Sequence, residues 1–248
     1  MVFPDRVEAW ADRKLDKAGF TSQSMLGMVM TICWILFSIT LVIRMTAGDG
    51  GYLAEQMLEH APPEESRLPE SEYPGMGDMI ADYLTRKTDE FQYTYTSDSG
   101  KLITCFQRHE ADHMADVRGL ISEDESTAVA AGITALIMFG ICFVVERRWR
   151  KFFEGMAIGL GIAAGIAIIL AMWAAVNFQG LFVTFHRIAF SNDGWRLNPN
   201  RDMLIRLMPI DFFISLGIRG ALQALIIPAI LAAVAGIGLW KTKSRGSK

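Results

Sequence analysis

The chain has 248 residues, of which 51% are hydrophobic and only 21% are charged, and its formal net charge is −3. This composition is too apolar for an ordinary soluble domain, and the apolar residues are concentrated in long blocks. The sequence has no basic patch of the kind that binds nucleic acid, so that class of function is excluded.

Four blocks of 19 to 22 residues contain no charged side chain. About 20 apolar residues in a helix span the hydrocarbon of a bilayer, and a helix satisfies its own backbone hydrogen bonds there. We therefore predict transmembrane helices over residues 25–43, 126–145, 155–176 and 220–240, with Asp124 or Ser126 capping the second. In the third, Gly161-x-x-x-Gly165 favours close helix packing.

Lysine and arginine cluster at three places: before the first block, between the second and third blocks, and after the fourth. Such residues collect on the cytoplasmic side of a membrane. We predict an amphipathic N-terminus (1–24), a basic loop (146–154) and a C-terminal tail (241–248), all cytoplasmic. Residues 44–125 and 177–219 then face outward.

The first outer segment is acidic, with 18 Asp and Glu residues against 7 Lys and Arg residues. Its residues 91–106 alternate polar and apolar side chains around a Ser-Asp-Ser-Gly turn, which predicts a β-hairpin. Residues 108–120 have helical spacing. The predicted fold class is therefore an α-helical membrane protein with four transmembrane helices and a small α+β extracytoplasmic domain between the first two. Cys105, in a hairpin strand, is interpreted as a packed thiol.

The helix begins with His109-Glu110-Ala111-Asp112-His113, the H-E-x-x-H pattern of zinc metallopeptidases. Two histidines one turn apart can bind zinc while the glutamate activates water. A third ligand could be His186, Glu123 or Glu125. Against this alternative, the pattern would lie on a soluble outer helix, and no later helix repeats a plausible ligand pattern.

A second interpretation pairs His113, before the second span, with His186, after the third. Both span ends face outward in the predicted topology, so the two side chains can approach one another. Asp116, Asp193 and Asp202 are available to fix their tautomers, whereas His60 and His109 are interpreted as surface residues. Two histidines without a serine or cysteine nucleophile suit a reaction in which the substrate supplies the nucleophile.

The second outer segment mixes aromatic and polar residues, which predicts a position at the membrane interface with Trp195 at head-group level. Arg219, near the outer end of the fourth span, either extends to the head groups or faces a polar cavity or an ester or phosphate group.

These residues resemble the lipoprotein intramolecular transacylase (Lit) family of bacterial membrane proteins. The resemblance is carried by Phe185-His186, by Phe190-Ser191-Asn192-Asp193-Gly194-Trp195 with the residues that follow it, and by Glu110-x-x-His113-Met114-x-Asp116-Val117-Arg118. The chain departs from the family pattern at Asn198, Met208 and Ile210.

The resemblance implies an acyltransferase that moves the sn-2 acyl chain of a diacylglyceryl-modified lipoprotein from glycerol to the α-amine of its N-terminal cysteine, which gives the lyso-form. It implies no metal, cofactor, nucleotide or nucleic acid, and partners limited to the lipoprotein substrate and membrane lipid. The implied location is the bacterial cell membrane, with the active site on the extracytoplasmic face. The expected catalytic residues are His113 and His186. The expected supporting or substrate-binding residues are Glu110, Asp116, Asn192, Asp193, Trp195, Asp202 and Arg219.

Overall fold

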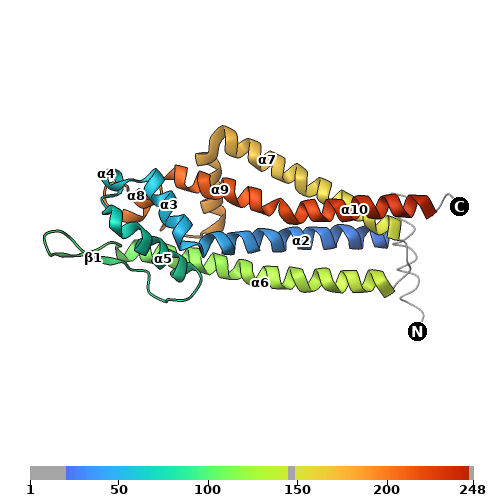
Figure 1. Ribbon diagram of the computed structural model, residues 1–248, viewed down its shortest axis with the longest axis horizontal. Helices are drawn as coiled ribbons and strands as arrows, with labels where there is room; N and C mark the ends of the chain where they lie inside the picture. Colours follow the sequence, from blue (N-terminus) through green and yellow to red (C-terminus); the bar gives the residue numbers. More distant parts are fainter. Residues whose placement is uncertain (1–20, 145–148, 246–248) are drawn as a thin grey trace. The chain divides into compact units, whose positions relative to one another are not determined.

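The computed structural model describes residues 21–144 and 149–245, and these residues are mostly helical (Figure 1). Nearly all of the predicted amphipathic N-terminus, together with Arg147 and Arg148 of the basic loop, lies outside the described residues.

The long helices are α2 (Ser22–Ala47), α6 (Arg108–Val144), α7 (Trp149–Ala189), and the consecutive pair α9 (Ile210–Ala224) and α10 (Ile226–Arg245). Within the described part of the chain, four helical stretches are long and apolar enough to cross a membrane: Ser22–Ala47, Arg108–Ile141, Trp149–Ala189 and Ile210–Lys243. Each overlaps one predicted block, so the prediction of a helical protein with four candidate membrane helices is confirmed.

Helix α6 differs from the prediction because it continues without a break from residues of the predicted outer segment into the apolar block. The helix runs through positions 124 and 126, so neither residue caps a new helix. The Ser126 hydroxyl instead donates to the Ser122 carbonyl one turn earlier, at 3.3 Å. Such a back-bond is compatible with an uninterrupted helix.

The helical interruption between α9 and α10 falls at Leu225, three residues before Pro228. A proline ring clashes with the carbonyl group four residues earlier, here that of Ala224, the last residue of α9. The proline therefore accounts for the position of the break.

The chain divides into two compact units. Of the described residues, the first comprises 21–39, 127–144, 149–170 and 224–245, and it contains a small core of Met30, Ala135, Phe152, Met156 and Ala235. In it, α7 approaches α2 through Gly155 and Gly159, where an added methyl group would meet the α2 backbone near Ser24 and Met28. Gly161 and Gly165 have nothing within 4 Å of such a methyl group. Gly155 and Gly159 therefore make the close helix contact, and the prediction that Gly161 and Gly165 make it is wrong.

The second unit comprises residues 40–126 and 171–223. It contains α3 (Gly50–His60), α4 (Pro63–Ser66), the 3-10 helix η1 (Glu70–Glu72), α5 (Tyr73–Leu84) and α8 (Met203–Leu207). The predicted hairpin is present as antiparallel strands β1 (Thr94–Thr96) and β2 (Leu102–Thr104), with Tyr95 opposite Ile103. One buried core of 16 hydrophobic residues joins α3, α5, the hairpin flanks, α6, α8 and α9.

Helix α7 changes direction at Asn177, whose φ of −155° and ψ of 76° are not helical (Figure 1). The Asn177 Oδ1 atom accepts a hydrogen bond from the Gly180 N–H at 2.8 Å and so caps a new helical segment. This second segment of α7 carries His186.

Candidate active site

His113 and His186 lie together in the second unit, although 73 positions separate them in the sequence. Their ring centroids are 6.1 Å apart, and the side chains are 7% and 8% exposed. The histidines come from α6 and from the last turns of α7. The structure therefore brings the predicted pair together in a largely buried setting.

The orientation of His186 is set by its own helix. Its Nδ1 atom lies 2.8 Å from the Phe182 carbonyl oxygen. Because a carbonyl only accepts hydrogen bonds, Nδ1 carries the proton, and in the neutral ring Nε2 keeps its lone pair. The predicted tautomer-fixing role of the aspartates thus falls to a backbone carbonyl for His186.

Aromatic rings surround the imidazole of His186. Phe182, Phe185, Phe190 and Trp195 have ring centroids 4.1, 5.5, 5.5 and 5.2 Å from it. Phe190 also contacts His113 at 5.3 Å. Phe182 was not predicted as a site residue, although its helical spacing of four residues before His186 could have indicated it.

His113 has one ring nitrogen without a partner. Its Nδ1 atom is buried and neither accepts nor donates a hydrogen bond within the described part of the chain. A buried polar atom of this kind normally has a partner, so this position is suited to contact a substrate.

Asp116 and Asn192 connect α6 to the loop that follows α7. The Asn192 amide nitrogen donates to Asp116 at 2.8 Å, and the Asn192 Oδ1 atom accepts from the Gly194 N–H at 2.8 Å. The second bond closes a tight turn immediately before Trp195. This turn determines where Trp195 packs against His186.

Glu110 has no exposed surface, and both of its carboxylate oxygens are occupied. They accept hydrogen bonds from the Gln107 N–H at 2.8 Å and from the Leu204 N–H at 2.7 Å. The first bond satisfies a donor at the N-terminus of α6. The second joins α6 to the start of α8.

Asp202 is also fully buried, and three residues bind its carboxylate. It accepts from the Asn198 N–H at 2.7 Å and from Arg201 at 2.8 Å, and its Oδ1 atom lies 3.0 Å from His109 Nε2. Burial disfavours the charged carboxylate, but these hydrogen bonds outweigh that effect and hold the pKa of Asp202 well below its usual range. Asp202 therefore binds His109. The prediction that His109 is a plain surface residue is wrong.

The geometry differs from the one that the zinc alternative needs. Within the described residues, the group of potential metal ligands that converges is His109, Glu110 and Asp202, whose ligand atoms lie within 4.8 Å of one another. His113 is not part of it. Glu110 already accepts two backbone N–H groups, and Asp202 accepts one backbone N–H and the Arg201 side chain, which favours a structural role for the cluster.

Arg219 lies against the start of α3. It forms an ion pair with Asp49 at 2.6 Å, and its guanidinium lies 3.8 Å from the centre of the Tyr52 ring. The hydrogen bond from Arg219 holds the pKa of Asp49 below its usual range. His60, predicted to be a surface residue, is half-buried nearby and lies 2.7 Å from the Ser215 hydroxyl.

Two further residues lie apart from this chemistry. Asp193 is 76% exposed and pairs with Arg196 at 3.1 Å. Cys105 is half-buried, and burial raises the pKa of its thiol to about 11, which agrees with a packed thiol and not with a nucleophile.

A model of the family described as "Lipoprotein intramolecular transacylase Lit" matches residues 28–213. The chain belongs to the Lit family. The match includes both motifs that carried the resemblance, and it confirms the family prediction.

Solved structures of the Lit transacylase from Bacillus cereus share the fold. One covers 89% of this chain and 96% of its own chain, at 21% identity and a TM-score of 0.66. A second, in which one histidine is replaced by arginine, covers 98% of this chain and 100% of its own, at 20% identity and a TM-score of 0.63. Comparison with curated proteins finds no significant match.

Membership in the Lit family supports a lipoprotein transacylase function, which makes the protein an acyltransferase. It also supports a location in a membrane.

Proposed function

We propose that this protein transfers the sn-2 acyl chain of a diacylglyceryl-modified lipoprotein to the α-amine of its N-terminal cysteine. The glycerol ester C–O bond breaks, an amide C–N bond forms, the amine loses a proton and the glycerol oxygen gains one. The product is a lyso-form lipoprotein. The family match supports the reaction class, and the His113–His186 pair is the observation that carries the proposal.

His186 is proposed as the general base. Its Nδ1–H is held by the Phe182 carbonyl, so Nε2 is the atom that can take the proton of the attacking amine. The same imidazolium can then return the proton to the departing glycerol oxygen, which is why one group suffices for both transfers.

His113 is proposed to stabilise the oxyanion of the tetrahedral intermediate. The Asn192 amide nitrogen already donates to Asp116. The buried Nδ1 atom of His113 has no partner within the described residues, and it becomes a hydrogen-bond donor when it carries the ring proton.

The supporting residues are proposed to act through position and not through contact with the reacting atoms. Glu110, Asp116, Asn192 and Trp195 form the contacts around the pair described above. Asp202 and Arg219 anchor neighbouring elements, and Asp193 is proposed to contribute little. Donor and acceptor belong to one molecule, so proximity supplies much of the acceleration, and the proposed reaction needs no cofactor or metal.

The proposed topology has both termini in the cytoplasm and the histidine pair on the extracytoplasmic face of the bacterial cell membrane. The distribution of lysine and arginine in the sequence supports this orientation. The membrane-spanning residues are proposed as 25–43, 126–145, 155–176 and 220–240, with the outer segments 44–125 and 177–219 between them. The lipid-borne ester would thus reach the pair from the outer leaflet.

The test is expression in bacteria that make diacylated lipoproteins, followed by mass spectrometry of the lipoprotein N-terminal peptides. The wild-type chain should produce N-acyl, monoacylglyceryl peptides, whereas H113A and H186A should not. If the wild-type chain yields no lyso-form product, the proposal is wrong.

The H109A variant separates this proposal from zinc peptidase chemistry. Zinc ligation requires His109, so that alternative predicts complete loss of activity and sensitivity to chelators. The transacylase proposal predicts that H109A keeps most of its activity and that chelators have no effect.

A further inference from the structure

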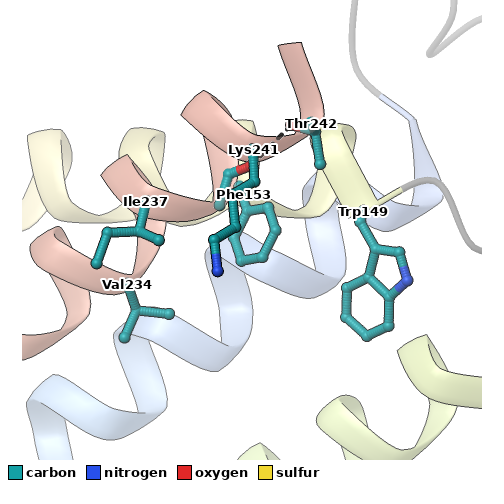
Figure 2. A pocket seen from close by; sticks show the side chains of 7 residues that line it. Trp149, Phe153, Val234, Ile237, Lys241 and Thr242 are labelled. Atoms are coloured by element: carbon teal, nitrogen blue, oxygen red, sulfur yellow. Dashed lines mark hydrogen bonds between the residues drawn. The ribbon is translucent and has the colours of Figure 1, made fainter. Parts of the chain in front are cut away.

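A groove in the first unit lies between the start of α7 and the end of α10. It has a volume of about 570 Å³, within the range of small-molecule sites. Figure 2 shows the labelled side chains around it: Trp149, Phe153, Val234, Ile237, Lys241 and Thr242. The histidine pair belongs to the other unit, so the groove has no part in the proposed acyl shift.

The lining of the groove is divided between an apolar part and a cationic end. Phe153, Val234 and Ile237 provide hydrocarbon surface, and Lys241 lies one turn beyond Ile237 on the same helix. Lys241 carries the positive charge among the residues that line the groove, and the Thr242 hydroxyl donates to the Gly238 carbonyl at 2.8 Å. This order of surfaces matches an amphipathic anion.

The apolar part depends on Gly238, which faces Phe153. A methyl group added to Gly238 would collide with the Phe153 ring. With glycine at this position, the ring packs directly against the α10 backbone and forms the wall of the groove. The same helix exposes Ile237 and Trp240 by 55% and 72%, which is surface that a membrane protein presents to lipid.

The surroundings of the groove are basic. Near it, the first turns of α7 and the end of α10 contain five basic residues and one acidic residue in the sequence: Arg150, Lys151, Lys241, Lys243 and Arg245 against Glu154. Arg150 and Lys151 form ion pairs with Glu154 at 3.1 and 2.9 Å. Basic pockets between transmembrane helices bind anionic lipid head groups.

We propose that this groove is a binding site for one anionic phospholipid, with an acyl chain along Phe153, Val234 and Ile237 and the phosphate head group at Lys241. Trp149 lies at the same end, where tryptophan typically marks the level of the head groups. The proposal does not depend on the acyltransferase activity.

The test uses the full-length chain in nanodiscs that contain equal amounts of phosphatidylglycerol and phosphatidylcholine, released for native mass spectrometry. We expect one retained phosphatidylglycerol in preference to phosphatidylcholine. One lysine near a membrane surface contributes about 1 kcal/mol to anionic lipid binding, so K241Q should lower that preference about fivefold.

Two matched controls define the site. K243Q removes a lysine from the same helix that does not line the groove and should change the preference less than twofold. I237W should fill the groove and lower total lipid retention, whereas I226W, on the same helix outside the groove, should not.

Three results would overturn the proposal: equal retention of the two lipids, an equal effect of K241Q and K243Q, or unchanged retention in I237W. A dimer that I237W dissociates would show that a second copy of the chain occupies the groove, and this result would also overturn it.

Discussion

Replacement of Glu110 by alanine tests whether this residue acts in structure or in chemistry. The carboxylate is fully buried and accepts the N–H groups of Gln107 and Leu204. In E110A the Leu204 N–H stays buried without an acceptor, which costs about 1–3 kcal/mol. Gln107 is exposed and its N–H can bind water, so the second loss is smaller, about 0.5–1.5 kcal/mol.

The expected total is about 1.5–4.5 kcal/mol of unfolding free energy. For a chain of this length, about 2–4 °C in Tm corresponds to each kcal/mol, so E110A should unfold roughly 3–18 °C below the wild type. Thermal unfolding of the purified protein in detergent, followed by tryptophan fluorescence, measures this difference. Asp112, an exposed carboxylate on the same helix, provides the control: D112A should change the free energy by less than about 0.5 kcal/mol.

The zinc alternative makes the opposite prediction for this variant. It assigns Glu110 the role of general base, so E110A would be inactive but as stable as the wild type. An unchanged Tm with complete loss of activity would refute a structural role for Glu110.

Three other changes test the contacts around the site. N192L removes the hydrogen bond to Asp116 and the turn that positions Trp195. It should lower kcat, measured by lyso-form production, about tenfold, equivalent to about 1.4 kcal/mol. Its Tm, measured by thermal unfolding, should change less than that of E110A. D202N should destabilise the protein at neutral pH. Because the folded pKa of Asp202 is depressed, its stabilisation is present above the unfolded pKa near 4 and is lost as the pH falls further, so the Tm difference between D202N and wild type should shrink from pH 6 to pH 3. R219Q and D49N should each lower Tm by a few degrees, and the Tm of the double variant should equal that of either single variant. If the losses in Tm add, the ion pair contributes nothing to stability.

The sequence predicted the features that depend on composition and local spacing. Block length is sufficient to find membrane helices, because lipid requires about 20 apolar residues and little else. Alternation around the Ser97–Gly100 turn was sufficient to find the hairpin. The histidine pair could be predicted because the predicted topology puts both span ends on one face, where the two side chains can approach one another.

Details that depend on packing could not be predicted. Gly155 and Gly161 both begin a G-x-x-x-G pattern, and only the α2 backbone near Ser24 distinguishes them. His109 precedes His113 by one turn, yet its partner is Asp202, 93 positions away. The sequence also gave no reason to choose the Phe182 carbonyl over a nearby aspartate as the partner of His186.

The spacing of three residues on α6 explains how the pair keeps its separation. Glu110, His113 and Asp116 follow one another at intervals of three, which places them near one face of the helix. The outer two bind Leu204 and Asn192, near either end of the segment that carries Trp195, and His113 lies between them. Since Trp195 packs on His186, displacement of this segment would change the environment of both histidines at once. We therefore propose that the carboxylates of this motif support the reaction by holding the second histidine and its aromatic surroundings at a constant distance from the first.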